Sequence, residues 1–69
     1  MQITRTEQLV LEQLVEGKSN AEIATQLSLS EGTVRNTASS LYGKLGVGNR
    51  LQAVQVALRR GLVRPVTPG

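Results

Sequence analysis

Apolar residues recur every three or four positions along most of this 69-residue chain, which is the period of an amphipathic α-helix. Thr4 and Glu7 precede the first such stretch at the spacing of a capping box, in which a hydroxyl and a carboxylate accept hydrogen bonds from backbone amides. Gly17 follows it, where a left-handed cap would end a helix. We therefore expect a first helix over about residues 5–16. Its apolar face consists of Val10, Leu11, Leu14 and Val15.

Two further helices are predicted after very short turns. Ser19 and Glu22 repeat the capping box and begin a short second helix over about residues 20–27. Ser30 is a good N-cap for a third helix, which ends before Gly46. The apolar residues are Ile23, Ala24 and Leu27 in the second helix and Val34, Ala38, Leu41 and Leu45 in the third.

Gly43 lies inside the predicted third helix. Glycine costs about 1 kcal/mol there relative to alanine, so propensity does not explain it. Either another backbone approaches this position closely or the space beside it is simply unfilled, and the sequence leaves both explanations open.

A fourth helix completes the predicted fold. Asn49 and Gln52 form a variant of the capping box, and the helix they open runs to about Arg60. No segment has the alternating pattern of a strand. The fold class is therefore all-α, with four helices in one domain over residues 3–63 and a proline-containing tail, residues 64–69, that we expect to be frayed.

The second and third helices have the spacing of a helix-turn-helix, because only two or three residues separate them. Ala24 supplies the small side chain that lets the two helices approach closely. Leu29 fills the turn, and Val34 fixes the start of the third helix. A plain helical bundle is the alternative, and the combined spacing favours the helix-turn-helix.

If the apolar residues of the third helix face inward, its opposite face is polar. Arginine, asparagine and serine on such a face are suited to base edges: arginine pairs with guanine, asparagine with adenine, and serine with either. An ordinary polar helix surface is the alternative, but the helix-turn-helix pattern favours DNA reading. The candidate base-reading residues are Arg35, Asn36, Ser39 and Ser40.

Other groups around this helix are candidates for contacts with DNA phosphates. The amides of Gly32 and Thr33 lie at the positive end of the helix dipole, with the Thr33 hydroxyl beside them. Asn20 stands at the start of the second helix and offers a similar end. Lys44 adds a positive charge, although a lone exposed lysine by default only increases solubility.

The fourth helix is apolar over a wider arc than packing against one core requires. Ala53 and Ala57 are expected to face the core. The surplus favours a homodimer through this helix, because a two-fold pair places its recognition helices in successive major grooves. A more deeply buried helix is the alternative. The candidate dimer residues are Leu51, Val54, Val56 and Leu58.

Arg50 lies in the first turn of the fourth helix, where the helix dipole disfavours a cation. We therefore expect it to pair with a carboxylate, that of Glu7 or Glu22. Such a pair would tie the fourth helix to the front of the domain. A phosphate contact is the alternative.

Composition narrows the function classes further. The chain has no cysteine and no histidine, which removes the usual metal ligands, thiol nucleophile and general base, so we expect no enzyme, metal site or cofactor. The net charge of +3 weakly favours a polyanion such as double-stranded DNA. No apolar run has the length of a membrane span or a signal peptide, so we expect a cytoplasmic protein without a membrane partner.

Many of the polar and apolar residues described above fall into five short sequence motifs. They are Ile3-Thr4-x-x-Glu7, Val10-Leu11, Gly17-x-Ser19-Asn20-x-Glu22-Ile23-Ala24, Leu29-Ser30-Glu31-Gly32-Thr33-Val34-Arg35 and Lys44-Leu45-Gly46-Val47-x-Asn49-Arg50-x-x-Ala53-Val54. These motifs closely resemble the LuxR-type helix-turn-helix, the DNA-binding output domain of quorum-sensing regulators and of many two-component response regulators.

The resemblance implies a four-helix domain that binds promoter DNA as a dimer through its fourth helix, with the third helix in the major groove. The family usually has a histidine where Thr37 stands and often a basic residue near Ser39 or Gly48, so this recognition surface is less charged than is usual. Carried over by position, the base-facing residues are Arg35, Asn36 and Ser39, and the backbone contacts are Thr33 and Lys44.

In most family members a receiver or ligand-binding domain precedes this one. The chain is therefore expected to be either a C-terminal fragment or a free-standing small regulator. An N-terminal receiver domain and RNA polymerase are further candidate partners. The −35-reading region of a sigma factor is an alternative function, although the segment from Lys44 to Val54 belongs to the LuxR type. A protein-interaction module on the same scaffold is another.

Overall fold

The computed structural model describes residues 2–64, and this part of the chain contains four α-helices and no strand. The helices are α1 (Arg5–Val15), α2 (Asn20–Leu27), α3 (Glu31–Leu45) and α4 (Arg50–Arg59). The predicted all-α, four-helix fold is confirmed, with helix boundaries that agree to within about one residue. The frayed tail expected at residues 64–69 lies outside the described residues, apart from Arg64.

The helices begin where polar side chains satisfy their first amides. Thr4 and Glu7 form a complete capping box, in which the Glu7 amide donates to Thr4 Oγ1 at 3.1 Å and the Thr4 amide donates to Glu7 Oε1 at 2.8 Å. Ser19 and Glu22 form the same box at the start of α2. An N-cap side chain contributes about 1 kcal/mol, so these boxes explain why such short helices begin at these positions.

The turn between α2 and α3 depends on one residue in a left-handed conformation. Ser28 has a φ of 59°, which is uncommon for a residue with a Cβ atom, and it ends α2. The Leu29 amide then donates to the Ala24 carbonyl at 2.8 Å, and the half-buried Leu29 side chain packs against the core. Ser30 caps α3 directly afterwards. The predicted helix-turn-helix is therefore present.

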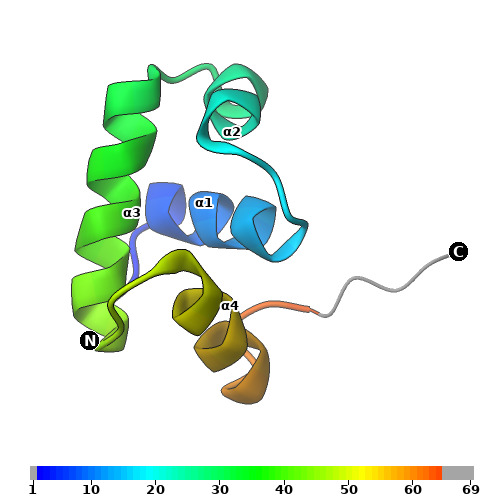
Figure 1. Cartoon of the computed structure of the whole chain (residues 1–69), viewed down its shortest axis with the longest axis vertical. Coiled ribbons are helices and arrows are strands. Elements are labelled where there is room, and N and C mark those ends of the chain that lie inside the picture. The colour runs from blue at the N-terminus through cyan, green and yellow to red at the C-terminus, as the bar shows by residue number, and fades with distance from the viewer. Residues whose placement is uncertain (1, 65–69) are drawn as a thin grey trace, which may run out of the picture.

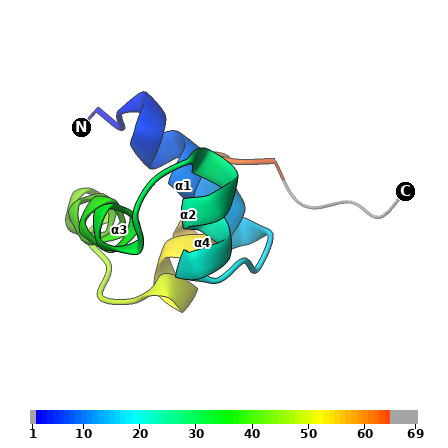
Figure 2. The same ribbon diagram turned by 90° about the horizontal axis from the view of Figure 1, so that it is seen from above.

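The other three helices pack around α1, and α3 lies at one edge of the molecule. α1 contacts all three, with α2 on one side of it and α4 on the other (Figure 1). Figure 2 shows α3 end-on, with the other helices on one side of it. One flank of α3 is thus packed and the other faces solvent. The buried core consists of Val10, Leu11, Leu14, Ile23, Ala24, Val34, Ala38, Leu41, Leu45, Ala53, Val56, Ala57 and Val63.

The packing of the core corrects the prediction for Val56 and decides between the two explanations for Gly43. Val56 is only 7% exposed and packs inward with Ala53 and Ala57, so its assignment to a dimer surface is wrong. These three positions share one face of α4, so the buried face of this helix includes Val56 as well as the two predicted alanines.

At Gly43, no neighbouring atom lies within 4 Å of the point that a Cβ would occupy. Unfilled space, and not a close backbone, accounts for that glycine.

Candidate nucleic-acid interface

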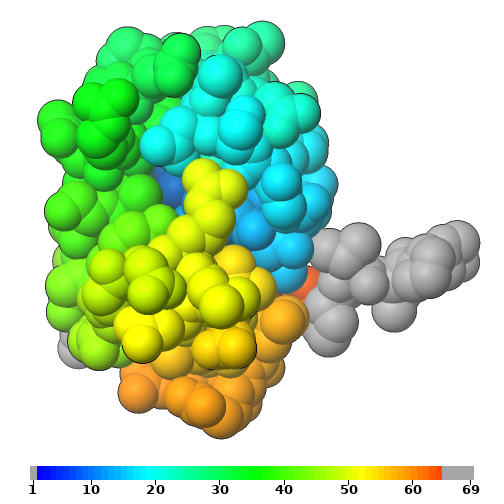
Figure 3. Space-filling view, in the orientation of Figure 1, coloured from blue at the N-terminus to red at the C-terminus, as the bar shows by residue number. Residues whose placement is uncertain are grey.

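α3 presents a polar face to solvent along one edge of the molecule. Figure 3 shows this helix, in green, forming that edge. Its four apolar residues are at most 5% exposed, which confirms the predicted inward orientation. The four candidate base-reading residues are all exposed. They are Arg35, Asn36, Ser39 and Ser40.

Three of these four side chains make no hydrogen bond or salt bridge with the residues that the structure describes. Arg35 makes no salt bridge, and neither Asn36 nor Ser39 makes a side-chain hydrogen bond, within the part of the chain that the structure describes. Their donors and acceptors are therefore open to an external partner. That they contact DNA bases stays a prediction.

The N-terminal end of α3 is partly occupied by its own cap. The Thr33 amide donates to Ser30 Oγ at 3.1 Å, and the Ser30 hydroxyl donates to Thr33 Oγ1 at 2.9 Å. The Thr33 amide, expected to be open to a phosphate, is thus already satisfied by the N-cap. The Thr33 hydroxyl can still donate its proton, and Gly32 is exposed beside it.

At the other end of α3, two predicted DNA contacts are bound to a buried carboxylate. Lys44 Nζ donates to Glu7 Oε1 at 2.6 Å and to the Gln2 carbonyl at 2.8 Å. The Ser40 hydroxyl donates to Glu7 Oε2 at 2.9 Å. Glu7 is 5% exposed, and no other polar or charged residue between positions 2 and 64 is buried. The side chains of Ser40 and Lys44 are therefore held on α1.

These contacts stabilise the ionised form of Glu7. The hydrogen bond from the Lys44 ammonium, followed by that from the Thr4 amide, lowers the pKa of Glu7 from 4.5 to about 2. Burial raises the pKa but is outweighed. Glu22 also has a lowered pKa, mainly because the Ser19 amide donates to its carboxylate. Unlike Glu7, Glu22 is exposed.

Arg50 connects α4 to the loop before α2, but not through a carboxylate. Its guanidinium donates to the Lys18 carbonyl at 2.5 Å and to Asn20 Oδ1 at 2.9 Å. The expected pairing with Glu7 or Glu22 is wrong, because a backbone carbonyl and an amide oxygen supply the acceptors instead. The expected tie between α4 and the front of the domain is nevertheless present. It also engages the oxygen of the Asn20 side chain, a candidate phosphate contact.

The outer face of α4 is apolar and exposed. Leu51 is 66% exposed and Leu58 is 41% exposed, and these are the large hydrophobic residues that the described part of the chain leaves most open to water. Val54 is half-buried between them. These three of the four candidate dimer residues lie at the surface. Their part in a dimer stays a prediction.

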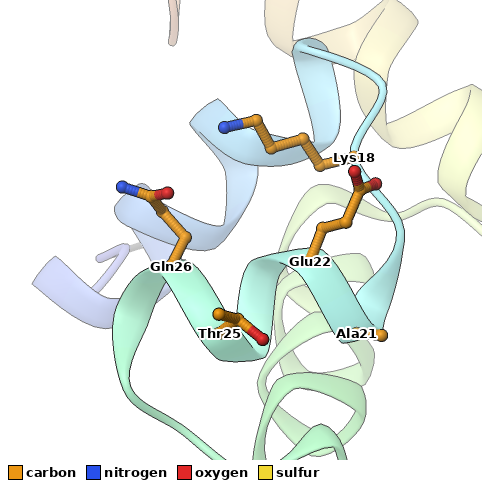
Figure 4. Close-up of a pocket in the computed structure, with 5 residues that line it drawn as sticks. All are labelled: Lys18, Ala21, Glu22, Thr25 and Gln26. Atoms are coloured by element: carbon orange, nitrogen blue, oxygen red, sulfur yellow. The ribbon is translucent and has the colours of Figure 1, made fainter.

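A shallow depression lies on the outer side of α2, away from the contacts of Glu7. Figure 4 shows the five residues that line it, from α2 and the loop before it, and none of them belongs to α3. The Glu22 carboxylate lies here beside the Lys18 side chain (Figure 4). The lining residues are Lys18, Ala21, Glu22, Thr25 and Gln26.

The geometry defines a class of protein. A helix-turn-helix carries an exposed helix whose polar face includes Arg35, which makes no ion pair with any residue from 2 to 64. Within residues 2–64 no cluster of acidic or other ligating side chains could hold a metal ion, and no helix there is long and apolar enough to cross a membrane. The short turn between α2 and α3 and the exposed polar face of α3 are features of a helix-turn-helix domain, a class that binds DNA through the second helix of the motif.

The comparisons with known proteins agree with this class. The family model described as bacterial regulatory proteins, luxR family, matches residues 1–57. The chain therefore belongs to the LuxR family of bacterial regulatory proteins, whose members include transcription regulators with a DNA-binding helix-turn-helix domain. This membership supports the main functional prediction and neither the sigma-factor nor the protein-interaction alternative.

Two curated relatives and one solved structure illustrate the match. The spore germination protein GerE of Bacillus subtilis (strain 168) is 49% identical over 59 residues, which cover 86% of this chain and 80% of GerE. The transcriptional regulatory protein YdfI of the same organism is 37% identical over 62 residues, covering 90% of this chain but 29% of YdfI. The crystal structure of the response regulator ChrA, from a heme-sensing two-component system, superposes with a TM-score of 0.87 at 35% identity, covering 91% of this chain and 31% of ChrA.

Reasoning from the sequence missed the contacts that join distant segments. Glu7 was predicted to form a capping box and to be one of two candidate partners of Arg50, but its bonds to Ser40 and Lys44, which span 33 and 37 residues, were not predicted. Gln8 was not singled out, yet its Nε2 donates to the Leu62 carbonyl at 2.9 Å and fixes the segment after α4 to α1. A single sequence carries no local signal for such pairs.

Proposed function

We propose that this domain binds promoter DNA in a sequence-specific manner, with α3 in the major groove. The observation that supports this most directly is the exposed polar face of a 15-residue helix on a helix-turn-helix scaffold. Such a helix fits the width of the major groove, where each base pair presents a distinct set of donors and acceptors. The family membership supports the same reading.

Three residues are proposed to read bases. Arg35 would donate both ends of its guanidinium to a guanine, and Asn36 would pair with an adenine. Ser39 lies next to them on the same face and would accept or donate one hydrogen bond. Ser40, which donates to Glu7, is the weaker candidate of the original four.

Phosphate contacts are proposed at the starts of α2 and α3. The Asn20 oxygen accepts from Arg50, so its side-chain amide protons remain to donate to a phosphate. The Gly32 amide and the Thr33 hydroxyl lie at the positive end of α3. Lys44, the fourth predicted phosphate contact, is not proposed to hold a phosphate, since its ammonium already has two acceptors.

A homodimer through α4 is the proposed arrangement on DNA. Leu51 and Leu58 are exposed apolar residues seven positions apart, and Val54 lies between them on the helix. Residues at this spacing share one face, so two copies of α4 bury a continuous apolar strip when they pack together. A two-fold pair would place two copies of α3 about 34 Å apart, one turn of the duplex.

The larger biological setting is also a proposal. The chain spans 29% of YdfI, so the activity of a whole regulator need not reside in this domain. We propose a cytoplasmic, non-enzymatic DNA-binding module. We propose a receiver domain and RNA polymerase as its further partners.

Selection of bound sites from a pool of random duplexes tests the proposal. The purified chain is incubated with the pool at low salt, and bound duplexes are recovered, amplified and sequenced over several rounds. We expect enrichment of a short motif repeated as two half-sites. A parallel selection with an Arg35→Ala variant is the matched control. If the wild-type chain enriches no motif, the proposed sequence-specific function is wrong.

A further inference from the structure

We infer that Glu7 is a positioning residue for the DNA-reading face of α3, acting through Ser40 and Lys44. The inference rests on the proposed function of α3. Glu7 belongs to α1 and lies 5% exposed beneath α3, so it does not itself reach a duplex. Its carboxylate joins α1 to α3 through a hydrogen bond from Ser40 and an ion pair with Lys44.

The carboxylate is fixed from both sides. On the α1 side, Oε1 accepts from the Thr4 amide at 2.8 Å, within a capping box at the positive end of the helix dipole. On the α3 side, Lys44 Nζ donates to the same oxygen at 2.6 Å and the Ser40 hydroxyl donates to Oε2 at 2.9 Å. Ser40 and Lys44 are four positions apart, which places them one above the other on α3. A rigid group on α1 thus holds one full turn of α3.

This bridge adds something that the apolar core does not provide. Apolar packing is non-directional, so the four buried residues of α3 constrain its rotation and translation less sharply than directional hydrogen bonds do. Charge-assisted hydrogen bonds are short and directional, so the Glu7 contacts limit both movements. Ser39, a proposed base contact, is the direct neighbour of Ser40 in the chain.

The two kinds of DNA contact differ in how much misplacement they tolerate. A bidentate pair with a base edge requires its donors to lie within a few tenths of an ångström of their acceptors. Attraction to phosphates depends on charge and falls off slowly with distance. If Glu7 positions α3, its loss lowers affinity for the preferred site much more than affinity for random DNA.

The experiment compares Glu7→Gln with Glu22→Gln. Glutamine can still accept the capping hydrogen bond, so each variant keeps its capping box and loses one negative charge. Glu22 provides the matched control because it has the same box distances as Glu7 but is exposed and makes no side-chain hydrogen bond to α3 within residues 2–64. Binding is measured by fluorescence anisotropy on the duplex selected by the wild type and on a random duplex of equal length. Circular dichroism sets a temperature at which all variants are folded.

The readout is the specificity ratio, which is the dissociation constant for the random duplex divided by that for the selected duplex. We expect Glu7→Gln to lower this specificity ratio about five- to tenfold, which is the loss of part of one bidentate base contact. Glu22→Gln should leave the ratio within about twofold of wild type. Partial unfolding would weaken both duplexes equally and leave the ratio unchanged. An unchanged ratio in folded Glu7→Gln therefore overturns the inference.

Lys44→Gln gives a second, independent arm. If Lys44 serves mainly to hold Glu7, this variant lowers the specificity ratio while the dependence of binding on salt stays nearly the same. If Lys44 instead grips a phosphate, both duplexes are weakened alike and the slope of log K against log salt falls by about 0.9. The second result would overturn the inference even if Glu7→Gln failed to fold. A wild-type chain that selects no site would instead refute the proposed function.

Discussion

Acid should destabilise this domain mainly through one carboxyl group, that of Glu7. Its pKa is about 2 in the folded protein and 4.5 in the absence of its partners. Because the folded-state pKa is the lower one, the folded protein gives up this proton more readily than the unfolded chain does. The associated stability is present above about pH 5 and is lost as the pH falls toward 2.

The size of the effect follows from the pKa difference. One pKa unit corresponds to about 1.4 kcal/mol, so the depression at Glu7 contributes about 3 kcal/mol to the free energy of unfolding at neutral pH. A domain of this length has a total stability on the order of 3–10 kcal/mol. Loss of the Glu7 contribution is therefore expected to bring the protein close to, or past, its unfolding midpoint between pH 4 and pH 2.

Urea unfolding followed by circular dichroism between pH 7 and pH 2 measures this contribution. The wild type is compared with Glu7→Gln, whose side chain does not titrate. We expect the stability gap between the two to shrink by about 3 kcal/mol from pH 7 to pH 2. The stability gap between the wild type and Glu22→Gln should also shrink as the pH falls, since the pKa of Glu22 is lowered in the folded protein as well. A wild-type to Glu7→Gln gap that stays constant with pH would refute the reasoning.

Three further variants test the packing and the dimer. Gly43→Ala should raise the free energy of unfolding by about 1 kcal/mol in a urea titration, because a Cβ there meets no atom and alanine favours the helix; a destabilised variant would contradict the open space. Arg50→Met should lower that free energy by about 1–3 kcal/mol, because two charge-assisted hydrogen bonds are lost, and unchanged stability would show that they contribute little. The double change of Leu51 and Leu58 to serine should abolish any dimer seen by analytical ultracentrifugation on DNA while leaving the monomer folded; a persistent dimer would move the interface elsewhere.

The parts of the fold that depend on near neighbours in the chain could be predicted from the sequence. Capping boxes and apolar periodicity are local signals, and they gave the four helices and the inward side of α3. The separation of Thr4 from Glu7 is three residues, and so is that of Ser19 from Glu22. Such pairs can be identified without knowledge of the tertiary structure.

The errors arise where a residue has many possible distant partners. Arg50 was expected to bind a carboxylate because opposite charges attract, but it donates to the Lys18 carbonyl and to Asn20. Every residue carries a carbonyl, so a sequence gives no means of choosing that acceptor. Lys44 was predicted to contact a phosphate from its charge and from the family resemblance, and its bond to Glu7, which lies 37 positions earlier, was not predicted.

The apolar surface of α4 was divided incorrectly for a related reason. Six of its residues between positions 51 and 58 are apolar, so periodicity alone does not separate the core side from the outer side. Val56 lies three positions after Ala53 and next to Ala57, so it shares their inward face and is only 7% exposed. Leu51 and Leu58 remain exposed as expected.

The central claim is that the outward face of α3 reads DNA bases, and Arg35→Ala tests it most directly. Arg35 is exposed and makes no ion pair among residues 2–64, so its removal should leave the fold intact. In a gel-shift titration we predict that the variant binds the wild type's selected duplex about 1–3 kcal/mol more weakly, with a smaller loss on random DNA. Equal affinity of both proteins for the selected duplex would contradict the account.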